Sequence, residues 1–153
     1  MKYLVIISII IIVFAVVMLL EPKTVKLYYY NPSLDVDEPG NILCSRQGLV
    51  PVEREVVNEP VIENTIRLLF KGQLTETERT SGITTEYPLE GFSLEKANLS
   101  ADGMLTLTFS DPSNKTVGGA CRVGILWFQI EATAKQFSGV KSVRFWPEEL
   151  FQP

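Results

Sequence analysis

The residues of this chain that are best suited to chemistry lie in one stretch, VGGACRV. In it Cys121 follows a glycine pair, Gly118 and Gly119, at the predicted start of a helix, and Arg122 comes next. A helix N-terminus and a neighbouring guanidinium group both stabilise a thiolate, so a reactive cysteine is one hypothesis. The others are a metal ligand and a disulfide to Cys44, the second of the two cysteines in the chain.

Composition argues against most catalytic and metal-binding arrangements. The chain contains no histidine, which removes Ser-His and Cys-His nucleophilic pairs and the commonest metal ligand. It has no Cys-x-x-Cys, no phosphate-binding P-loop and no Gly-x-Gly-x-x-Gly. The backbone N–H groups of Gly118 and Gly119 suit an anion, but a role in the turn explains this pair better. We therefore expect no catalytic residue, no bound cofactor and no metal ion.

Arg54 is the other residue with an unusual setting. It lies in the predicted strand LVPVEREVV, where it shares a face with Val50, Val52 and Val56. Its side chain either extends to solvent or a neighbouring acid at the sheet edge, or forms a structural ion pair or a contact with a partner. Arg54 is therefore a candidate for structural or partner contacts, as are Arg122 and the two glycines before it.

The first residues of the chain have the composition of a membrane anchor. From Tyr3 to Leu20 no side chain is charged, and a helix of this length reaches about 27 Å, close to the hydrocarbon thickness of a bilayer. No small-residue cleavage site follows, so a signal anchor fits better than a cleaved signal peptide or a buried core helix. We expect residues 1–21 to form a transmembrane signal anchor that contacts the lipid bilayer through residues 3–20.

Residues 22–153 are expected to form one domain outside the cytoplasm. A very short N-terminal flank directly before an apolar run is the usual form of an export signal. The chain carries 14 Lys and Arg against 18 Asp and Glu, a formal net charge of −4, which is not the charge of a nucleic-acid-binding protein. We therefore predict a single-pass protein of the cytoplasmic membrane that binds no nucleic acid.

An exported domain favours a disulfide between Cys44 and Cys121 over two free thiols. The bond would close a loop of about 80 residues, for which the chain-entropy model gives about 4 kcal/mol of stabilisation. It would also tie the first long loop of the domain to the start of its last helix.

Hydrophobic periodicity predicts five strands and two helices in the exported domain. The strands are expected over residues 24–30, 49–57, 92–99, 104–109 and 140–146, the helices over 59–71 and 121–137, and long loops over 31–41 and 73–91. The order β-β-α-β-β-α-β predicts an α+β fold, with a mixed β-sheet and both helices packed on one of its faces.

The second predicted helix has one apolar stripe. Val123, Trp127, Ile130, Ala134 and Phe137 are spaced so that they lie on the same side of an α-helix. We expect this side to face the sheet rather than a partner.

Several segments, taken in order, resemble the GerMN domain, the sporulation and spore germination family. They are PVEREV (51–56), LLFKG (68–72), LSADGMLTLTFS (99–110), GGACRVGILWFQI (118–130) and QFSGVKSVRFW (136–146). The resemblance covers residues 24–147. The chain departs from the family pattern after the first helix, where Gln73 follows Gly72 in place of a Gly-Pro-Thr, and after the last strand, where Pro147 replaces a glycine turn.

The resemblance implies a bacterial envelope domain without catalytic residues. It implies a non-catalytic module on the outer face of the cytoplasmic membrane, which assembles with an envelope protein partner or with itself. The alternative is a cell-wall-directed enzyme or a domain that binds a small ligand. A pocket with convergent polar groups would favour that alternative.

Overall fold

The computed structural model describes residues 22–57 and 59–152. The anchor predicted in residues 1–21 lies outside these ranges. Within them, no helix combines the length and the apolar character needed to cross a bilayer.

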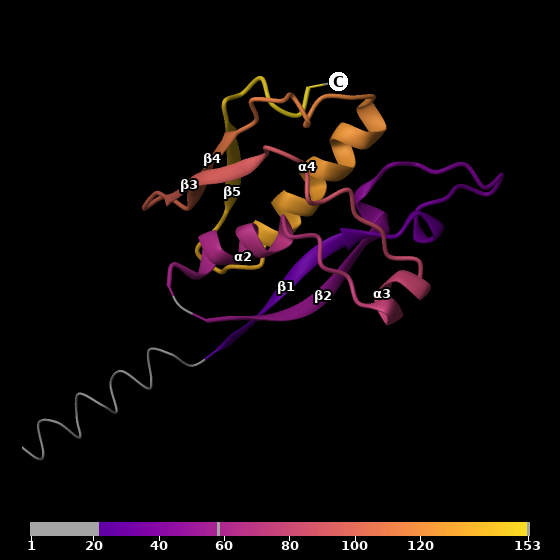
Figure 1. The fold of residues 1–153 in the computed structure, drawn as a ribbon, viewed down its shortest axis with the longest axis horizontal. Coiled ribbons are helices and arrows are strands. Elements are labelled where there is room, and N and C mark those ends of the chain that lie inside the picture. The colour runs from indigo at the N-terminus through magenta and orange to yellow at the C-terminus, as the bar shows by residue number, and fades with distance from the viewer. Residues whose placement is uncertain (1–21, 58, 153) are drawn as a thin grey trace, which may run out of the picture.

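In the described part of the chain, five strands form two separate sheets (Figure 1). In the first, β1 (Lys23–Tyr30) and β2 (Leu49–Val56) run antiparallel, with Lys23 opposite Val56 at one end and Tyr30 opposite Leu49 at the other. In the second, β4 (Met104–Ser110) lies between β3 (Ser93–Leu99), its antiparallel partner, and β5 (Ser142–Trp146), its parallel partner. The predicted α+β class is confirmed, and the second sheet is mixed.

The prediction of a single sheet with both helices on one face is wrong. The two long helices, α2 (Val61–Leu69) and α4 (Ala120–Lys135), pack against each other, and each contacts a strand of both sheets. Helix α2 contacts β1 and β3, and α4 contacts β1 and β5. Because the helices offer apolar side chains to both sheets, β1 and β2 bury their inner face without joining β3, β4 and β5.

A third helix, α3 (Glu76–Thr80), lies in the segment 73–91 that was predicted to be a loop. The Thr75 side chain accepts a hydrogen bond from the Glu78 backbone N–H, and the Glu78 carboxylate accepts one from the Thr75 N–H. This reciprocal arrangement is a capping box. Its signature, Thr-x-x-Glu, is present in the sequence, so the helix start was predictable.

The core is built from the alternation of the strands and from the stripe on α4. Strand β1 buries Val25, Leu27 and Tyr29, and β4 buries Leu105, Leu107 and Phe109. On α4, Val123, Ile130 and Ala134 are buried and Trp127 is partly buried. Phe137, which was predicted to belong to the helix, lies two residues after its end and is partly buried against the same core. The prediction that this stripe faces the protein interior is confirmed.

Gly72 ends the turn after α2 in a conformation that requires glycine. Its φ is +60°, and a Cβ added there would lie 1.9 Å from the backbone oxygen of Tyr87. Any other residue would therefore displace the segment that carries Tyr87.

Candidate protein-binding surface

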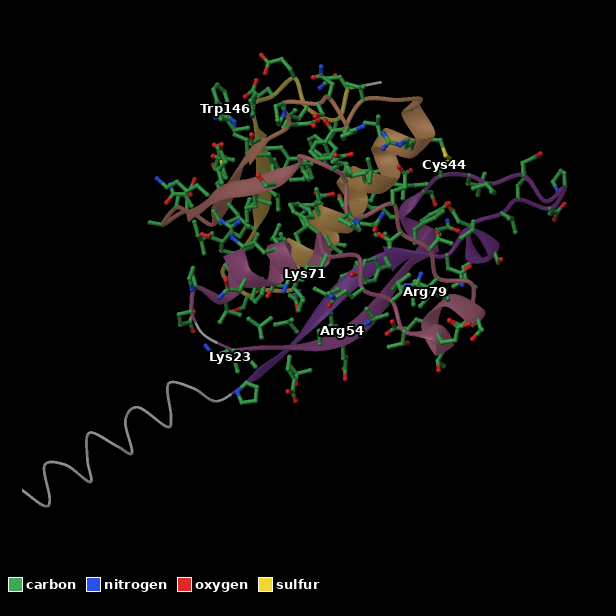
Figure 2. All side chains as sticks on the ribbon, in the orientation of Figure 1. Lys23, Cys44, Arg54, Lys71, Arg79 and Trp146 are labelled. Carbon is green, nitrogen blue, oxygen red and sulfur yellow. A yellow bond between two sulfur atoms is a disulfide. The ribbon has the colours of Figure 1, made fainter. Side chains whose placement is uncertain are left out.

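A disulfide joins Cys44 to Cys121, with the two Cα atoms 5.2 Å apart. The bond fastens the loop between β1 and β2 to the first turn of α4, and Figure 2 shows Cys44 beside that helix. This is the pairing that the sequence favoured. Because neither cysteine is free, the thiolate and metal-ligand hypotheses for Cys121 do not describe this state of the protein.

The loop held by this disulfide, residues 31–45, projects from the end of the first sheet and is called the finger below (Figure 1). Its two arms are joined by a bridge between Val36 and Ile42. At the tip, the Gly40 N–H donates to the Asp37 carbonyl over 2.9 Å, and the Asp37 N–H donates to the Asn41 carbonyl over 3.0 Å. The finger is therefore a small, ordered hairpin.

A buried carboxylate fixes the base of the finger. Asp35 is fully buried and accepts hydrogen bonds from the Tyr30 hydroxyl at 2.6 Å, the Ser45 N–H at 2.5 Å and the Ser45 hydroxyl at 2.6 Å. Burial raises the pKa of Asp35, but the hydrogen bonds from Ser45 and Tyr30 outweigh it and hold this pKa below its ordinary value. Asp35 is therefore ionised at neutral pH and joins both arms of the finger to β1.

A second tether lies just after the finger. Arg46 begins the short 3-10 helix η2 (Arg46–Gly48) and forms an ion pair with Glu131 of α4. Its guanidinium group also lies 4.1 Å from the ring centre of Phe128, in a cation–π contact. The disulfide and Arg46 thus attach the finger to α4 at two points.

The finger exposes its large apolar side chains to solvent, and the two residues that it buries are both polar. Its buried residues are Asn31 and Asp35, whereas Leu34, Val36, Ile42 and Leu43 are 59%, 45%, 53% and 49% exposed. Val36 and Ile42 are bridge partners, and Leu34 and Leu43 lie within two residues of them in the chain. Exposed apolar side chains concentrated in one element in this way mark a candidate interaction site. The sequence identified the loop but not this surface. The available signal was a group of apolar residues on both sides of an Asp-Glu-Pro-Gly turn.

Arg122 stabilises the segment that leads into α4 through an ion pair and hydrogen bonds to the backbone. Its Nε lies 2.6 Å from a carboxylate oxygen of Glu86, and its other nitrogens donate to the carbonyls of Val117 and Lys115 at 2.6 and 3.0 Å. A Cβ added at Gly118 would lie 3.1 Å from the Arg122 side chain. Arg122 and Gly118 therefore shape the chain beside the disulfide.

Gly119 is the N-cap residue of α4, and no side chain caps this helix end. A Cβ added at Gly119 would meet nothing within 4 Å. The residue before the pair, Val117, is 51% exposed and lies close in sequence to Cys121, so it adds an apolar side chain to the same end of the domain.

Arg54 belongs to a different part of the molecule (Figure 2). It forms a two-pronged ion pair with the carboxylate of Glu78 at 2.8 and 2.6 Å and donates to the Gln73 carbonyl at 3.0 Å. The Arg54 guanidinium group is the main cause that lowers the pKa of Glu78 to about 2. Of the two hypotheses for Arg54, the structural ion pair is the one observed.

The described residues form shallow surface hollows, and the charges in the hollow beside Trp127 are paired with each other. A hollow of about 310 Å³ lies against Trp127 and Phe145, and Arg144 and Glu148 at its margin pair with each other. Another of about 330 Å³ lies between β2 and α2. Within the described ranges, no three His, Cys, Asp or Glu residues are grouped as metal ligands.

These features define a class: an α+β module with an ordered, disulfide-tethered finger that presents apolar side chains to solvent. Comparison with protein families then gives the particular family. The model for Germane, described as sporulation and spore germination, matches residues 26–149, and the chain belongs to this family. The membership agrees with the resemblance seen in the sequence.

A solved structure has a similar fold. It holds the tandem GerMN domains of the sporulation protein GerM from Bacillus subtilis, which are 22% identical in sequence, with a TM-score of 0.56. The alignment covers 84% of this chain and 40% of that one, so this chain spans less than half the length of the solved protein. No curated protein matches the chain.

Proposed function

We propose that this protein is a non-catalytic assembly module of a bacterial cell envelope. Residues 3–20 anchor it in the cytoplasmic membrane, and the domain on the outer face binds another envelope protein through the finger. Membership of the sporulation and spore germination family supports the envelope setting. The disulfide supports an oxidising location outside the cytoplasm.

The single observation that carries the proposal is that the finger exposes its large apolar side chains and buries a carboxylate. A loop that exposes Leu34, Val36, Ile42 and Leu43 while burying an ionised Asp35 gains nothing from this arrangement in the free domain. The disulfide and the Asp35 hydrogen bonds order the loop in advance, so little conformational entropy remains to be lost on binding. Ordered apolar side chains in one exposed element are what a protein interface requires.

The alternative, a cell-wall-directed enzyme or a small-ligand site, has less support. A catalytic site needs groups that converge on a substrate, with at least one available as acid, base or nucleophile. The chain has no histidine, its cysteines form a disulfide, and the charged residues at the hollow beside Trp127 are paired with each other. No nucleic-acid partner is proposed, because the net charge is −4.

The test uses the full chain in native membranes. After cell fractionation we expect the domain in the membrane fraction, accessible to protease added outside spheroplasts. Treatment with an amine-reactive crosslinker is expected to give a discrete band larger than the protein itself. Recovery of the domain in the soluble fraction, protection from external protease, or the absence of any crosslinked band would each contradict the proposal.

A further inference from the structure

We propose that the finger inserts into an apolar groove with a basic rim on a different envelope protein, at the end of the domain away from the membrane. The inference rests on the proposed function. It adds the chemistry of the partner's binding groove and the end of this domain to which the partner binds. Three observations carry it: the direction of β1, the charge of the finger, and the position of the hollows on this chain.

The direction of β1 places the finger far from the point where the chain enters the domain. Strand β1 runs from Lys23 to Tyr30, and at about 3.3 Å per residue it spans about 26 Å. The finger begins directly after Tyr30, and Figure 2 shows Lys23 and Cys44 at opposite ends of the molecule. An anchor that precedes Lys23 therefore leaves the finger pointing away from its own membrane.

The negative charge at the tip of the finger indicates which kind of surface the finger binds. Residues 31–45 contain no Lys or Arg, and the tip carries exposed Glu38 and partly exposed Asp37. Hydrogen bonds from Asn41 lower the pKa of Asp37, so this carboxylate is ionised at neutral pH. Apolar sides with an acidic tip fit a groove that is apolar within and basic at its rim. The same acidic tip is repelled by the anionic headgroups of a bilayer.

The hollows on this chain argue against a second copy as the occupant. One hollow does combine apolar residues, Val56 and Leu68, with two cations, Arg67 and Lys71. Val56, however, is the register partner of Lys23, so this hollow lies at the end of the domain opposite the finger. If two copies are anchored side by side in one membrane, the finger of one copy lies farther from the membrane than this hollow of the other copy and cannot reach it. The hollow beside Trp127 is apolar as well, but its cation, Arg144, pairs with Glu148 of the same chain. We therefore take the occupant to be a different protein.

The first experiment places a photo-crosslinking amino acid at single positions of the full chain in native membranes. The test position is Ile42, which is 53% exposed, and the matched control is Val57, which is 52% exposed and lies at the other end of the domain. We expect a protein adduct at position 42 that is absent at position 57. The adduct is identified by mass spectrometry, and the partner is then purified.

The second experiment measures binding of the purified partner to the full chain in detergent. Replacing both Leu34 and Ile42 with Ser is expected to raise Kd tenfold or more, whereas Val57→Ser changes Kd by less than twofold. Glu38→Gln is expected to raise Kd and to reduce its dependence on salt, because a contact with the basic rim is lost. All three variants keep the Tm of the unmodified protein, because the replaced side chains are exposed.

Several outcomes would overturn the inference. They are an adduct at position 42 with lipid or with a second copy, equal adducts at positions 42 and 57, no adduct, and a partner whose Kd the double variant leaves unchanged. The amine-reactive crosslink separates these failures from failure of the proposed function. If the crosslinked band persists when Leu34 and Ile42 are both replaced with Ser, the protein still assembles with a partner. Only the proposal that it binds through the finger is then wrong.

Discussion

Two long connections, the finger and the segment 73–91, are tied back to the domain by different chemistry. The segment turns its apolar residues inward: Leu74, Ile83 and Tyr87 are buried in the core. An ion pair between Arg54 and Glu78 completes its attachment. The finger buries no apolar residue of its own, and a covalent bond and a buried carboxylate hold it in place.

The difference shows how each connection uses its apolar side chains. Packing against the core is enough to order the segment 73–91, so its ion pair adds to an attachment that already exists. The finger keeps its apolar side chains in solvent and cannot be ordered by packing. A disulfide orders it without covering that surface, which leaves the surface free for a partner.

The largest expected effect is the loss of the disulfide. Replacing Cys44 and Cys121 with Ser removes a crosslink across 77 residues, which the chain-entropy model values at about 4 kcal/mol of unfolding free energy. Unfolding by urea, followed by fluorescence, measures the loss. Reduction of the unmodified protein is the control and should give the same decrease. A loss below about 1 kcal/mol would contradict this prediction, because the crosslink would then add little to the stability of the folded domain.

Gly72→Ala tests the start of the segment 73–91. With φ at +60° and the Tyr87 oxygen 1.9 Å from the new Cβ, the variant should lose at least about 2 kcal/mol of unfolding free energy. Gly124→Ala is the matched control, because this glycine lies inside α4 and a Cβ there meets only the Phe128 ring, at 3.6 Å. The control is expected to be neutral or to stabilise α4 by up to about 1 kcal/mol. Equal losses from both variants would contradict the conclusion that the conformation at position 72 requires glycine.

Glu78→Gln tests the ion pair of the same segment through pH. The folded-state pKa of Glu78 is lowered from 4.5 to about 2, so its stabilisation is present above pH 4.5 and is lost as the pH falls toward 2. After screening at this partly exposed site, about 2 kcal/mol is expected at pH 7. The variant should be less stable at pH 7 and should show a flatter stability curve between pH 5 and 2.

The control for this variant is Glu76→Gln, which removes an exposed acid from the first turn of the same helix. Its expected effect on the unfolding free energy at pH 7 is below about 1 kcal/mol. Urea unfolding across the acid range compares the two variants. Identical curves would mean that the pairing with Arg54 adds nothing beyond a charge at the helix N-terminus.

Much of the local structure was predictable from the sequence. The alternation of Leu105, Leu107 and Phe109 identified β4, and the stripe with Ile130 and Ala134 gave the buried side of α4. The separation into two sheets was not predictable, because periodicity gives the inner face of a strand but not its neighbours. Helix α3 was missed because its five residues are too few for a hydrophobic period, although its capping box is present.

The candidate site was predictable only in part. The cysteine pair followed from the small number of cysteines and the expected export. The partner of Arg54 could not be identified from the sequence, because Glu78 is 24 residues away in the chain and is brought to Arg54 only by the fold. The exposed apolar surface of the finger was missed for a similar reason. Leu34 and Ile42 have no period of their own, and only the fold shows that nothing in the described chain covers them.

The smallest expected effect concerns the finger itself and completes the comparison. Ile42→Ala removes a side chain that is 53% exposed, so the unfolding free energy should change by less than about 0.5 kcal/mol. Ile66→Ala removes the same atoms from a fully buried position on α2 and should cost about 2–5 kcal/mol. Urea unfolding of both variants gives the contrast directly. If Ile42→Ala cost more than about 1 kcal/mol, its side chain would be part of the packing that stabilises the free domain. The apolar surface of the finger would then have a structural reason to exist, and the argument that it awaits a partner would lose its basis.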